Sequence, residues 1–212
     1  MSPLTVVPLA LLPSWLSAEG LFDLLGPWAL IGFTAIIFLE CALFVGIFFP
    51  GDSLLFLTGL LVASGQMDEP LWLVMVVLYI AAVLGNIVGY HFGEVIGPRL
   101  LNRPNSKFLR PEYVTKTHEF FEKHGARAIV LARFVPIVRT LITAVAGIAG
   151  MDRKRFYFYS AIGAVVWVIG VTGLGALLGE IEFVRANLEP ILLGMVLLSV
   201  IPVVLEIKKS RS

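Results

Sequence analysis

The chain alternates long apolar runs with short polar breaks, and the length of each run predicts how it meets a membrane. A helix needs about 20 apolar residues to span the hydrocarbon core. Residues 70–90 and 156–179 meet this length, and we predict them as transmembrane helices. Residues 191–205 predict a shorter C-terminal transmembrane helix, followed by a basic tail. The pattern indicates an all-α, polytopic integral membrane protein.

Two further apolar runs are interrupted near their centres. Residues 29–65 contain Pro50, and residues 128–151 contain Pro136. Proline lacks the backbone N–H that continues a helix, so each break favours a turn inside the run. We therefore predict two helical hairpins, each followed by a transmembrane helix.

The segments outside these runs are polar or mixed. Residues 1–28 combine Leu and Phe with acidic side chains and predict an interfacial amphipathic segment, without the basic stretch of a cleaved signal peptide. Residues 91–127 predict a long amphipathic loop that carries all three histidines, which we expect to be surface residues. The predicted membrane core therefore extends from residue 29 to residue 179.

The charges predict the orientation of the chain. All 16 Lys and Arg residues lie at or after Arg99, whereas seven acidic residues precede it. The positive-inside rule places loop 91–127 in the cytoplasm. If residues 128–151 form a re-entrant hairpin, the basic turn at 153–155 and the basic C-terminus also lie in the cytoplasm. The same reasoning lets residues 29–65 enter from the opposite face. We predict a multi-pass protein of the cytoplasmic membrane with two opposed hairpins, as in inverted-repeat transporters.

The composition excludes several classes of protein. Hydrophobic residues make up 58% of the 212-residue chain and charged residues 15%, against about 25% charged in soluble domains. The single cysteine, Cys41, excludes an internal disulfide, and the apolar runs contain no histidine and no cluster with metal-ligand spacing. A lipid phosphatase needs a metal or an activated nucleophile, so we expect no enzyme, no metal and no cofactor. The net charge of +1 says little about partners, and we expect no nucleic-acid partner.

Four ionisable residues lie within the broken runs, and we call them the charged quartet: Glu40, Asp52, Arg133 and Arg139. A cation at the centre of a spanning helix costs roughly 2.5–3.5 kcal/mol, so buried charges pair with one another or line a solute pathway. One interpretation is a static set of salt bridges that fastens the hairpins together. In the other, the arginine forks bind a phosphate, and the carboxylates exchange protons as the phosphate arrives and leaves.

Residues around the two breaks are expected to shape the hairpin tips. Pro50 and Gly51 predict either a simple turn or a tip whose free backbone N–H groups point at an anion. The other expected tip residues are Ser53, Phe134 and Pro136. Trp167 lies in the last predicted span, and we expect it to face lipid or the core.

Two motifs indicate a family. Residues 49–53, which follow the acidic Glu40, read Phe-Pro-Gly-Asp-Ser and are similar to a P-G-[DE]-[ST] motif. Residues 132–139 contain the spacing R-F-x-P-x-x-R, with Ala146-Gly147 and Met151 beyond. On these motifs, roughly residues 21–179 resemble the DedA family of bacterial inner-membrane proteins, which shares its domain with eukaryotic lipid scramblases of the VTT class. Ser160 departs from the asparagine that the family often has.

The resemblance implies that the charged quartet is essential and that transport depends on the proton-motive force. For some members the implied substrate is undecaprenyl phosphate, returned from the outer to the inner leaflet. We therefore expect a lipid-phosphate translocase driven by the proton gradient, with membrane lipids as its partners. The alternative is a proton-coupled exporter of small cations or drugs, or a pH-homeostasis protein, in which the arginines are structural. The sequence leaves open the lipid, the direction of transport and whether the chain forms a homo-oligomer.

Overall fold

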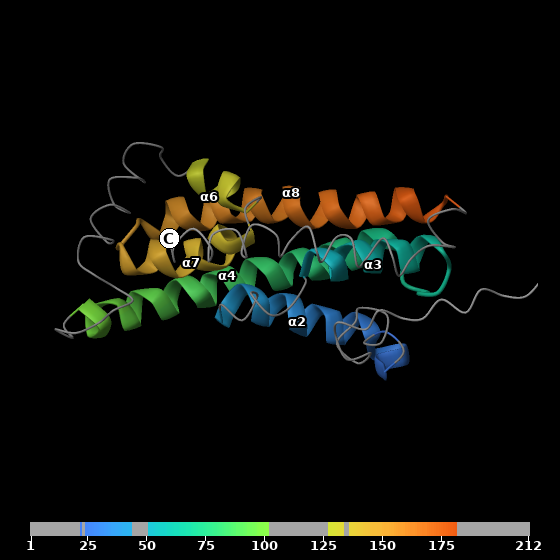
Figure 1. Cartoon of the computed structure of the whole chain (residues 1–212), viewed down its shortest axis with the longest axis horizontal. Coiled ribbons are helices and arrows are strands. Elements are labelled where there is room, and N and C mark those ends of the chain that lie inside the picture. Colours follow the sequence, from blue (N-terminus) through green and yellow to red (C-terminus); the bar gives the residue numbers. More distant parts are fainter. Residues whose placement is uncertain (1–21, 23, 44–50, 102–126, 134–135, 182–212) are drawn as a thin grey trace, which may run out of the picture.

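Helices make up every described element of the chain except its turns. Figure 1 shows the computed structural model, in which the described residues are 22, 24–43, 51–101, 127–133 and 136–181. No strand occurs among them. Three helical stretches in this part are long and apolar enough to cross a membrane: Gly26–Leu43, Leu71–Ile96 and Arg153–Gly179. An all-helical, polytopic membrane protein is confirmed at this level.

Several predicted segments lie outside the described residues: positions 1–21 of the amphipathic segment, positions 102–126 of the polar loop, and the C-terminal span at 191–205.

Two long helices, α4 (Leu71–Leu101) and α8 (Arg153–Gly179), pack against each other and run in opposite directions (Figure 1). Asp152 precedes α8 and caps it, because its carboxylate accepts the backbone N–H of Arg155 at 2.9 Å. Such a cap satisfies a helix N–H that otherwise has no partner. The aspartate in the basic turn therefore fixes where the last described helix begins.

The outward face of α4 carries exposed large apolar side chains at about one per turn: Trp72, Val76, Ile80, Leu84, Val88, Phe92 and Val95. A helix in a soluble protein buries such a stripe, so this face is suited to contact with lipid. The stripe continues past Tyr90, where the sequence pattern predicts the end of the span. The helix correspondingly continues to Leu101, and the first residues of the predicted loop 91–127 belong to α4.

Each broken apolar run folds as a set of shorter helices. The first run gives α2 (Ala29–Leu43) and α3 (Gly51–Ala63), preceded by the short helix η2 (Gly26–Trp28). The second run gives α6 (Arg127–Ala132) and α7 (Pro136–Ile148). Pro136 occupies the first position of α7, where a proline is tolerated because the first N–H groups of a helix have no intrahelical partner. By length and composition the stretch from η2 through α2 also meets the requirement for a span.

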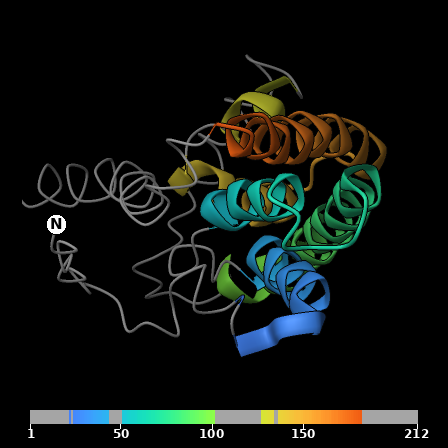
Figure 2. The same ribbon diagram turned by 90° about the vertical axis from the view of Figure 1, so that its right-hand side faces the viewer.

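α3 forms the inside of the bundle. Seen end-on, it lies between α8 and α2 (Figure 2), and nearly all of its residues are buried. The fully buried side chains around it come from four helices and include Phe33, Ile37, Leu57, Leu60, Leu78 and Val168. In lipid, burial of apolar surface from water does not drive such packing, so close van der Waals contact has to hold the helices together.

The contact between α3 and α8 brings the two backbones together. A methyl group on Gly59 would overlap the carbonyl oxygen of Thr172, and one on Gly175 would overlap the carbonyl oxygen of Phe56. The contacting residues are three apart on each helix, and the two helices meet in opposite order. Only glycine permits this approach at both positions.

The contact between α7 and α4 repeats this arrangement. A methyl group on Gly147 would overlap the carbonyl oxygen of Tyr90, and one on Gly93 would overlap the carbonyl oxygen of Ala144. The residues are again three apart on each helix and again meet in opposite order. In addition, α2 packs on α4 as α6 packs on α8. The two halves of the described chain are therefore related by an approximate internal two-fold symmetry.

Candidate functional site

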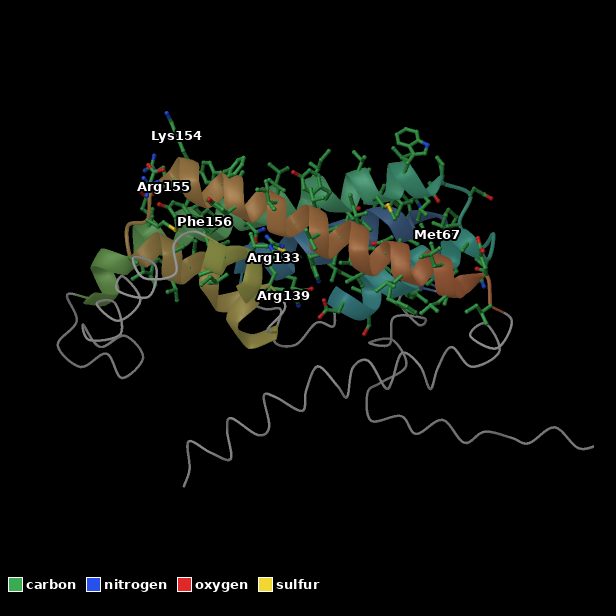
Figure 3. All side chains as sticks on the ribbon, turned by 90° about the horizontal axis from the view of Figure 1, so that it is seen from above. Met67, Arg133, Arg139, Lys154, Arg155 and Phe156 are labelled. Atoms are coloured by element: carbon green, nitrogen blue, oxygen red, sulfur yellow. The ribbon has the colours of Figure 1, made fainter. Side chains whose placement is uncertain are left out.

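The charged quartet comes together where the broken helices end. Glu40 lies in the last turn of α2, Asp52 in the first turn of α3, Arg139 in the first turn of α7, and Arg133 directly after α6. Figure 3 shows the two arginines next to each other near the middle of the bundle. Met67 lies toward one end, and Lys154 and Arg155 lie at the other. The sequence predicts helix breaks at two proline-containing stretches. The four residues near these breaks are distant in the sequence but lie close together in the bundle.

Arg139 holds both carboxylates at once. Its Nη1 donates to Asp52 Oδ1 at 2.7 Å, and its Nη2 donates to Glu40 Oε1 at 2.5 Å. The Glu40 side chain is 2% exposed and that of Asp52 is 28% exposed. A buried charge needs such pairing, because an isolated one loses its hydration without compensation. One guanidinium therefore links α2, α3 and α7.

Arg133 has a different environment. It is buried, and its Nη2 donates to Ser160 Oγ of α8 at 3.2 Å. Its Nη1 is also buried and has no hydrogen-bond partner among the described residues, and no carboxylate of that part of the chain bridges it. Buried polar groups are nearly always satisfied, so an unpartnered guanidinium nitrogen indicates a place for an anion or a water molecule.

Trp167 lies in the core, one of the two predicted positions, but it is also part of the site, which the sequence does not predict. The residue is buried near the middle of α8, and its Nε1–H donates to Asp52 Oδ1 at 2.6 Å. The Cζ atom of Arg139 lies 4.6 Å from the ring centroid, and that of Arg133 lies 5.8 Å from it. Both distances are within the range of cation–π interactions. Tryptophan is usually enriched near the ends of a membrane span. The position of Trp167 far from both ends of its predicted span is therefore the sequence signal for a role in the site.

Gly51 lies against Glu40. A Cβ atom at Gly51 would overlap Glu40 Oε2, and that oxygen is buried without a partner among the described residues. Gly51, at the start of α3, therefore leaves space for the carboxylate of Glu40. Ser53, two residues further along α3, is buried, and its Oγ has no partner in the described part of the chain. Pro50 and Phe134, the other expected tip residues, lie outside the described part of the chain.

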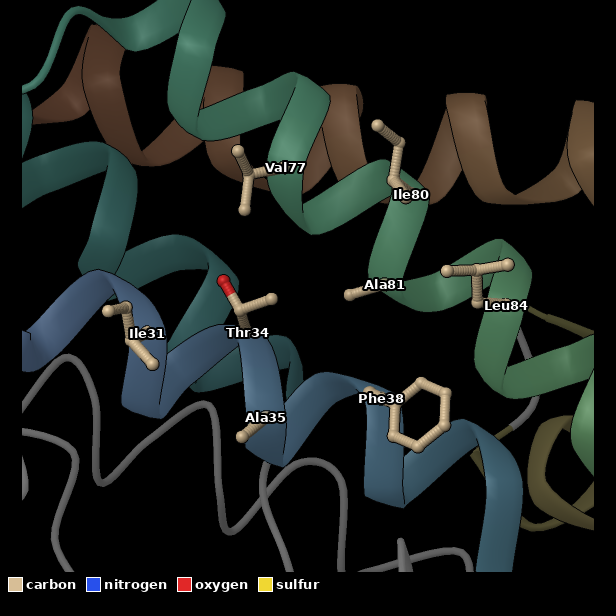
Figure 4. Close-up of a pocket in the computed structure, with 8 residues that line it drawn as sticks. All are labelled: Ile31, Thr34, Ala35, Phe38, Val77, Ile80, Ala81 and Leu84. Carbon is tan, nitrogen blue, oxygen red and sulfur yellow. The ribbon is translucent and has the colours of Figure 1, made fainter.

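An apolar groove of about 440 Å³ lies between α2 and α4 on the outside of the bundle (Figure 4). Its lining residues are Ile31, Thr34, Ala35, Phe38, Val77, Ile80, Ala81 and Leu84. The hydroxyl of Thr34 donates to the Leu30 carbonyl oxygen at 2.6 Å, so the groove offers no free polar side chain. Its chemistry suits hydrocarbon, whereas an anion would need the charged quartet.

A second polar network fastens α4 to the start of α8. Arg153 Nη2 donates to Glu94 Oε1 at 2.7 Å, and the other oxygen of Glu94 lies 3.1 Å from His91 Nδ1. The hydroxyl of Tyr157 lies 2.7 Å from the opposite ring nitrogen of this histidine. These side chains are exposed or half-exposed, so solvent screens their charges. The network is suited to holding the helices in register at this end.

A helical bundle with outer faces suited to lipid and a largely buried set of charges at mid-length defines a polytopic membrane protein with an internal polar site. Residues 49–177 match the VTT domain. The chain is 42% identical over 186 residues to Protein DedA of Escherichia coli (strain K12), which covers 88% of this chain and 85% of that protein. The chain therefore belongs to the DedA family of VTT-domain membrane proteins.

Other relatives have the same character. An uncharacterised membrane protein of Mycobacterium leprae (strain TN) is 41% identical over 189 residues, 89% of this chain and 82% of that protein. The inner membrane protein YqjA of Escherichia coli (strain K12) is 38% identical over 145 residues, 68% of this chain and 65% of that protein. No solved structure matches the chain.

Proposed function

We propose that the protein is a proton-coupled transporter that moves a lipid phosphate, such as undecaprenyl phosphate, across the cytoplasmic membrane. The observation that carries the proposal is the buried Nη1 of Arg133, which has no partner among the described residues and lies beside a guanidinium already bridged by two carboxylates. An anion completes this site, because it supplies the acceptor that Arg133 lacks. The protein is a carrier in this proposal and not an enzyme.

The two arginines have different tasks. Arginine presents a planar fork of donors that matches phosphate oxygens. Arg133 binds the phosphate first, since its donors are not occupied by a carboxylate of the described chain. Arg139 becomes available only when Glu40 or Asp52 releases it. Both arginines thus bind the phosphate in this scheme, Arg133 before Arg139.

The carboxylates supply the coupling to protons. A phosphate that approaches Arg139 competes with Glu40 and Asp52 for the same guanidinium. A carboxylate that loses its arginine in a poorly solvated place is stabilised by taking up a proton. Arrival of the anion therefore favours protonation, and its departure restores the two bridges. The proton gradient across the membrane then drives net transport.

The broken helices supply alternating access. In the proposed topology, α2–α3 and α6–α7 are re-entrant hairpins that enter from opposite faces, and the loop at 91–127 and the C-terminus lie in the cytoplasm. The bridges from Arg139 to Glu40 and Asp52 join the second half of the symmetric bundle to the first. Their release loosens the contact between halves, as rocking motions in inverted-repeat transporters require.

A lipid substrate follows from the surroundings of the site. The outer faces of the bundle are apolar. Transfer of a hydrocarbon tail from the membrane into water is unfavourable. A phosphate held at mid-length with its tail in lipid avoids the cost of moving that tail through water. A small-cation exporter is less compatible with this site, because both carboxylates already contact Arg139.

Equilibrium binding of labelled undecaprenyl phosphate to the purified protein tests the phosphate assignment. We expect Arg133→Ala to weaken binding by about ten-fold or more, the value of a hydrogen bond to a charged group. Arg133→Lys should recover only part of this loss, because an ammonium group lacks the planar fork. Arg155→Ala removes an exposed arginine and is the matched control. Undecaprenol without phosphate should bind equally to all four proteins.

Full recovery of binding by Arg133→Lys would contradict the fork argument. Equal weakening by Arg155→Ala would show that the phosphate binds through general surface charge.

A further inference from the structure

Two parts of Trp167 touch different members of the charged quartet. The indole Nε1–H donates to Asp52 Oδ1 at 2.6 Å, and the ring lies against the guanidinium groups of Arg139 and Arg133. The side chain is 3% exposed, so it does not anchor the span at the headgroups as interfacial tryptophans do. Its position needs another explanation.

We infer that Trp167 is a positioning residue that couples Asp52 to Arg133, so that proton exchange at the acid moves the arginine that receives the anion. The inference rests on the proposed function, because it assigns a proton to Asp52 and an anion to Arg133.

The first step is a shared oxygen atom. Asp52 Oδ1 accepts from Arg139 Nη1 at 2.7 Å and from the Trp167 indole at 2.6 Å. The Trp167 bond is charge-assisted only while the carboxylate is ionised, and the Arg139 bond stops being an ion pair when Asp52 takes up a proton. A proton on Asp52 therefore weakens its hold on α7 and on α8 together.

The second step is the face of the indole ring. Two guanidinium groups near one another repel, and the negative face of an aromatic ring attracts both. The ring is thus the surface against which Arg133 and Arg139 can lie together. A rotation or shift of the indole, once Asp52 no longer holds its Nε1–H, changes the position of both cations.

The third step is the shape of α8 around Arg133. Ser160, Gly163 and Trp167 are spaced three and four residues apart, so they share one face of the helix. Ser160 Oγ accepts from Arg133 Nη2 at 3.2 Å. A Cβ on Gly163 would lie 2.9 Å from both Cδ and Nε of Arg133, so the glycine leaves room for the side chain. Ser160 thus accepts a hydrogen bond from Arg133, Gly163 leaves space for its side chain, and the ring of Trp167 attracts its guanidinium. Together these three residues position Arg133 against α8.

Other ionisable groups also face this contact. Glu40 and Cys41 of α2, Arg139 of α7 and Tyr79 of α4 interact electrostatically with Arg133. Asp52, Arg139 and Arg133 interact electrostatically with Glu40. Glu40 is the second acid bound to Arg139, so a test has to separate its titration from that of Asp52.

The transport test compares Trp167→Phe with Trp167→Leu in proteoliposomes that contain undecaprenyl phosphate. Phenylalanine keeps a ring and removes the N–H that donates to Asp52, so the pH dependence of transport should move to higher pH by about one to two units. Leucine removes the ring as well, and transport should fall about ten-fold or more at every pH. Trp72→Phe, on the exposed stripe of α4, is the control and should leave the profile unchanged.

A pH profile of Trp167→Phe that coincides with that of the unchanged protein overturns the inference. So does full transport by Trp167→Leu at all pH values. Size-exclusion chromatography after extraction measures how much of each variant is folded in the membrane. Equal amounts show that a loss of transport does not come from a loss of fold.

A second measurement is independent of transport. In a protein whose other three tryptophans are changed to phenylalanine, the fluorescence of Trp167 should change as Asp52 titrates. Asp52→Asn should abolish this transition, and Glu40→Gln should retain it at a shifted pH. Fluorescence that does not change with pH overturns the inference even if transport proceeds. A transition that depends on Asp52 in a protein that moves no undecaprenyl phosphate supports the link and refutes the proposed function alone.

Discussion

Replacement of Gly51 by alanine directly perturbs the contact between Glu40 and Arg139. The added Cβ would overlap Glu40 Oε2 and would also lie within 2.8 Å of Oε1. The carboxylate therefore has to leave its position, and its 2.5 Å bond to Arg139 breaks. Separating a buried ion pair costs about 3–5 kcal/mol. Because Asp52 remains on Arg139, we expect the lower part of this range, about 3 kcal/mol.

Thermal unfolding of the purified protein measures the effect. For a chain of 150–250 residues, 1 kcal/mol corresponds to roughly 2–4 °C in Tm, so the expected fall for Gly51→Ala is about 6–12 °C. Gly170→Ala is the matched control, because a Cβ at this position of α8 meets no atom within 4 Å. Alanine is favoured over glycine inside a helix by up to about 1 kcal/mol, so the control should be neutral or stabilising.

A double-mutant cycle identifies the cause of the fall. In the Glu40→Ala background the carboxylate is absent, so Gly51→Ala should cost less than about 1 kcal/mol. An equal cost in both backgrounds would refute the reasoning, because the loss would then come from the backbone of α3. A Tm for Gly51→Ala equal to that of Gly170→Ala would refute it as well.

Three further changes have defined expectations. Gly163→Ala removes the gap beside Arg133 and should weaken binding of undecaprenyl phosphate several-fold with little change in Tm. Arg139→Gln leaves two carboxylates without their cation, so the variant should be less stable than the parent and should gain Tm as pH falls, since protonation removes the unpaired charges. Asp152→Ala removes the cap of α8 and should lower stability by about 1 kcal/mol, while binding of the lipid stays unchanged.

Much of the architecture can be predicted from apolar length and proline position. All of the predicted spans 70–90 and 156–179 except Pro70 lies within long helices, and the breaks around Pro50 and Pro136 separate shorter ones. The end of α4 is less predictable, because the polar residues after Tyr90 alternate with a lipid-facing stripe that continues. The rise in polar residues after Tyr90 therefore hides the fact that α4 continues with one apolar face.

The charged quartet can be predicted as a set because charge in an apolar run is costly wherever it lies. Its internal pairing cannot be predicted, since contacts over 87 and 99 positions of sequence separation depend on how the halves dock. The same holds for Trp167 and Ser160. Their role depends on which face of α8 turns toward Arg133, and an almost uniformly apolar helix carries no periodicity that would show this face.

The internal symmetry relates the helix contacts of the two halves but not their charges. Glycines make equivalent backbone contacts at α3–α8 and at α4–α7. The quartet departs from this symmetry, because both acids lie in the first half of the chain and both arginines in the second. The ion pairs of the site therefore always join one half to the other. This is the arrangement in which titration of an acid affects the contact between halves.

The central claim is that Arg133 receives a lipid phosphate whose movement is coupled to protons at Glu40 and Asp52. The most direct measurement is uptake of undecaprenyl phosphate from one leaflet of proteoliposomes, with and without an imposed pH gradient. The unchanged protein should move the lipid faster with the gradient, and Arg133→Ala should abolish the gradient-dependent part at normal protein content. Equal rates with and without the gradient, or an unaffected Arg133→Ala variant, would contradict the account.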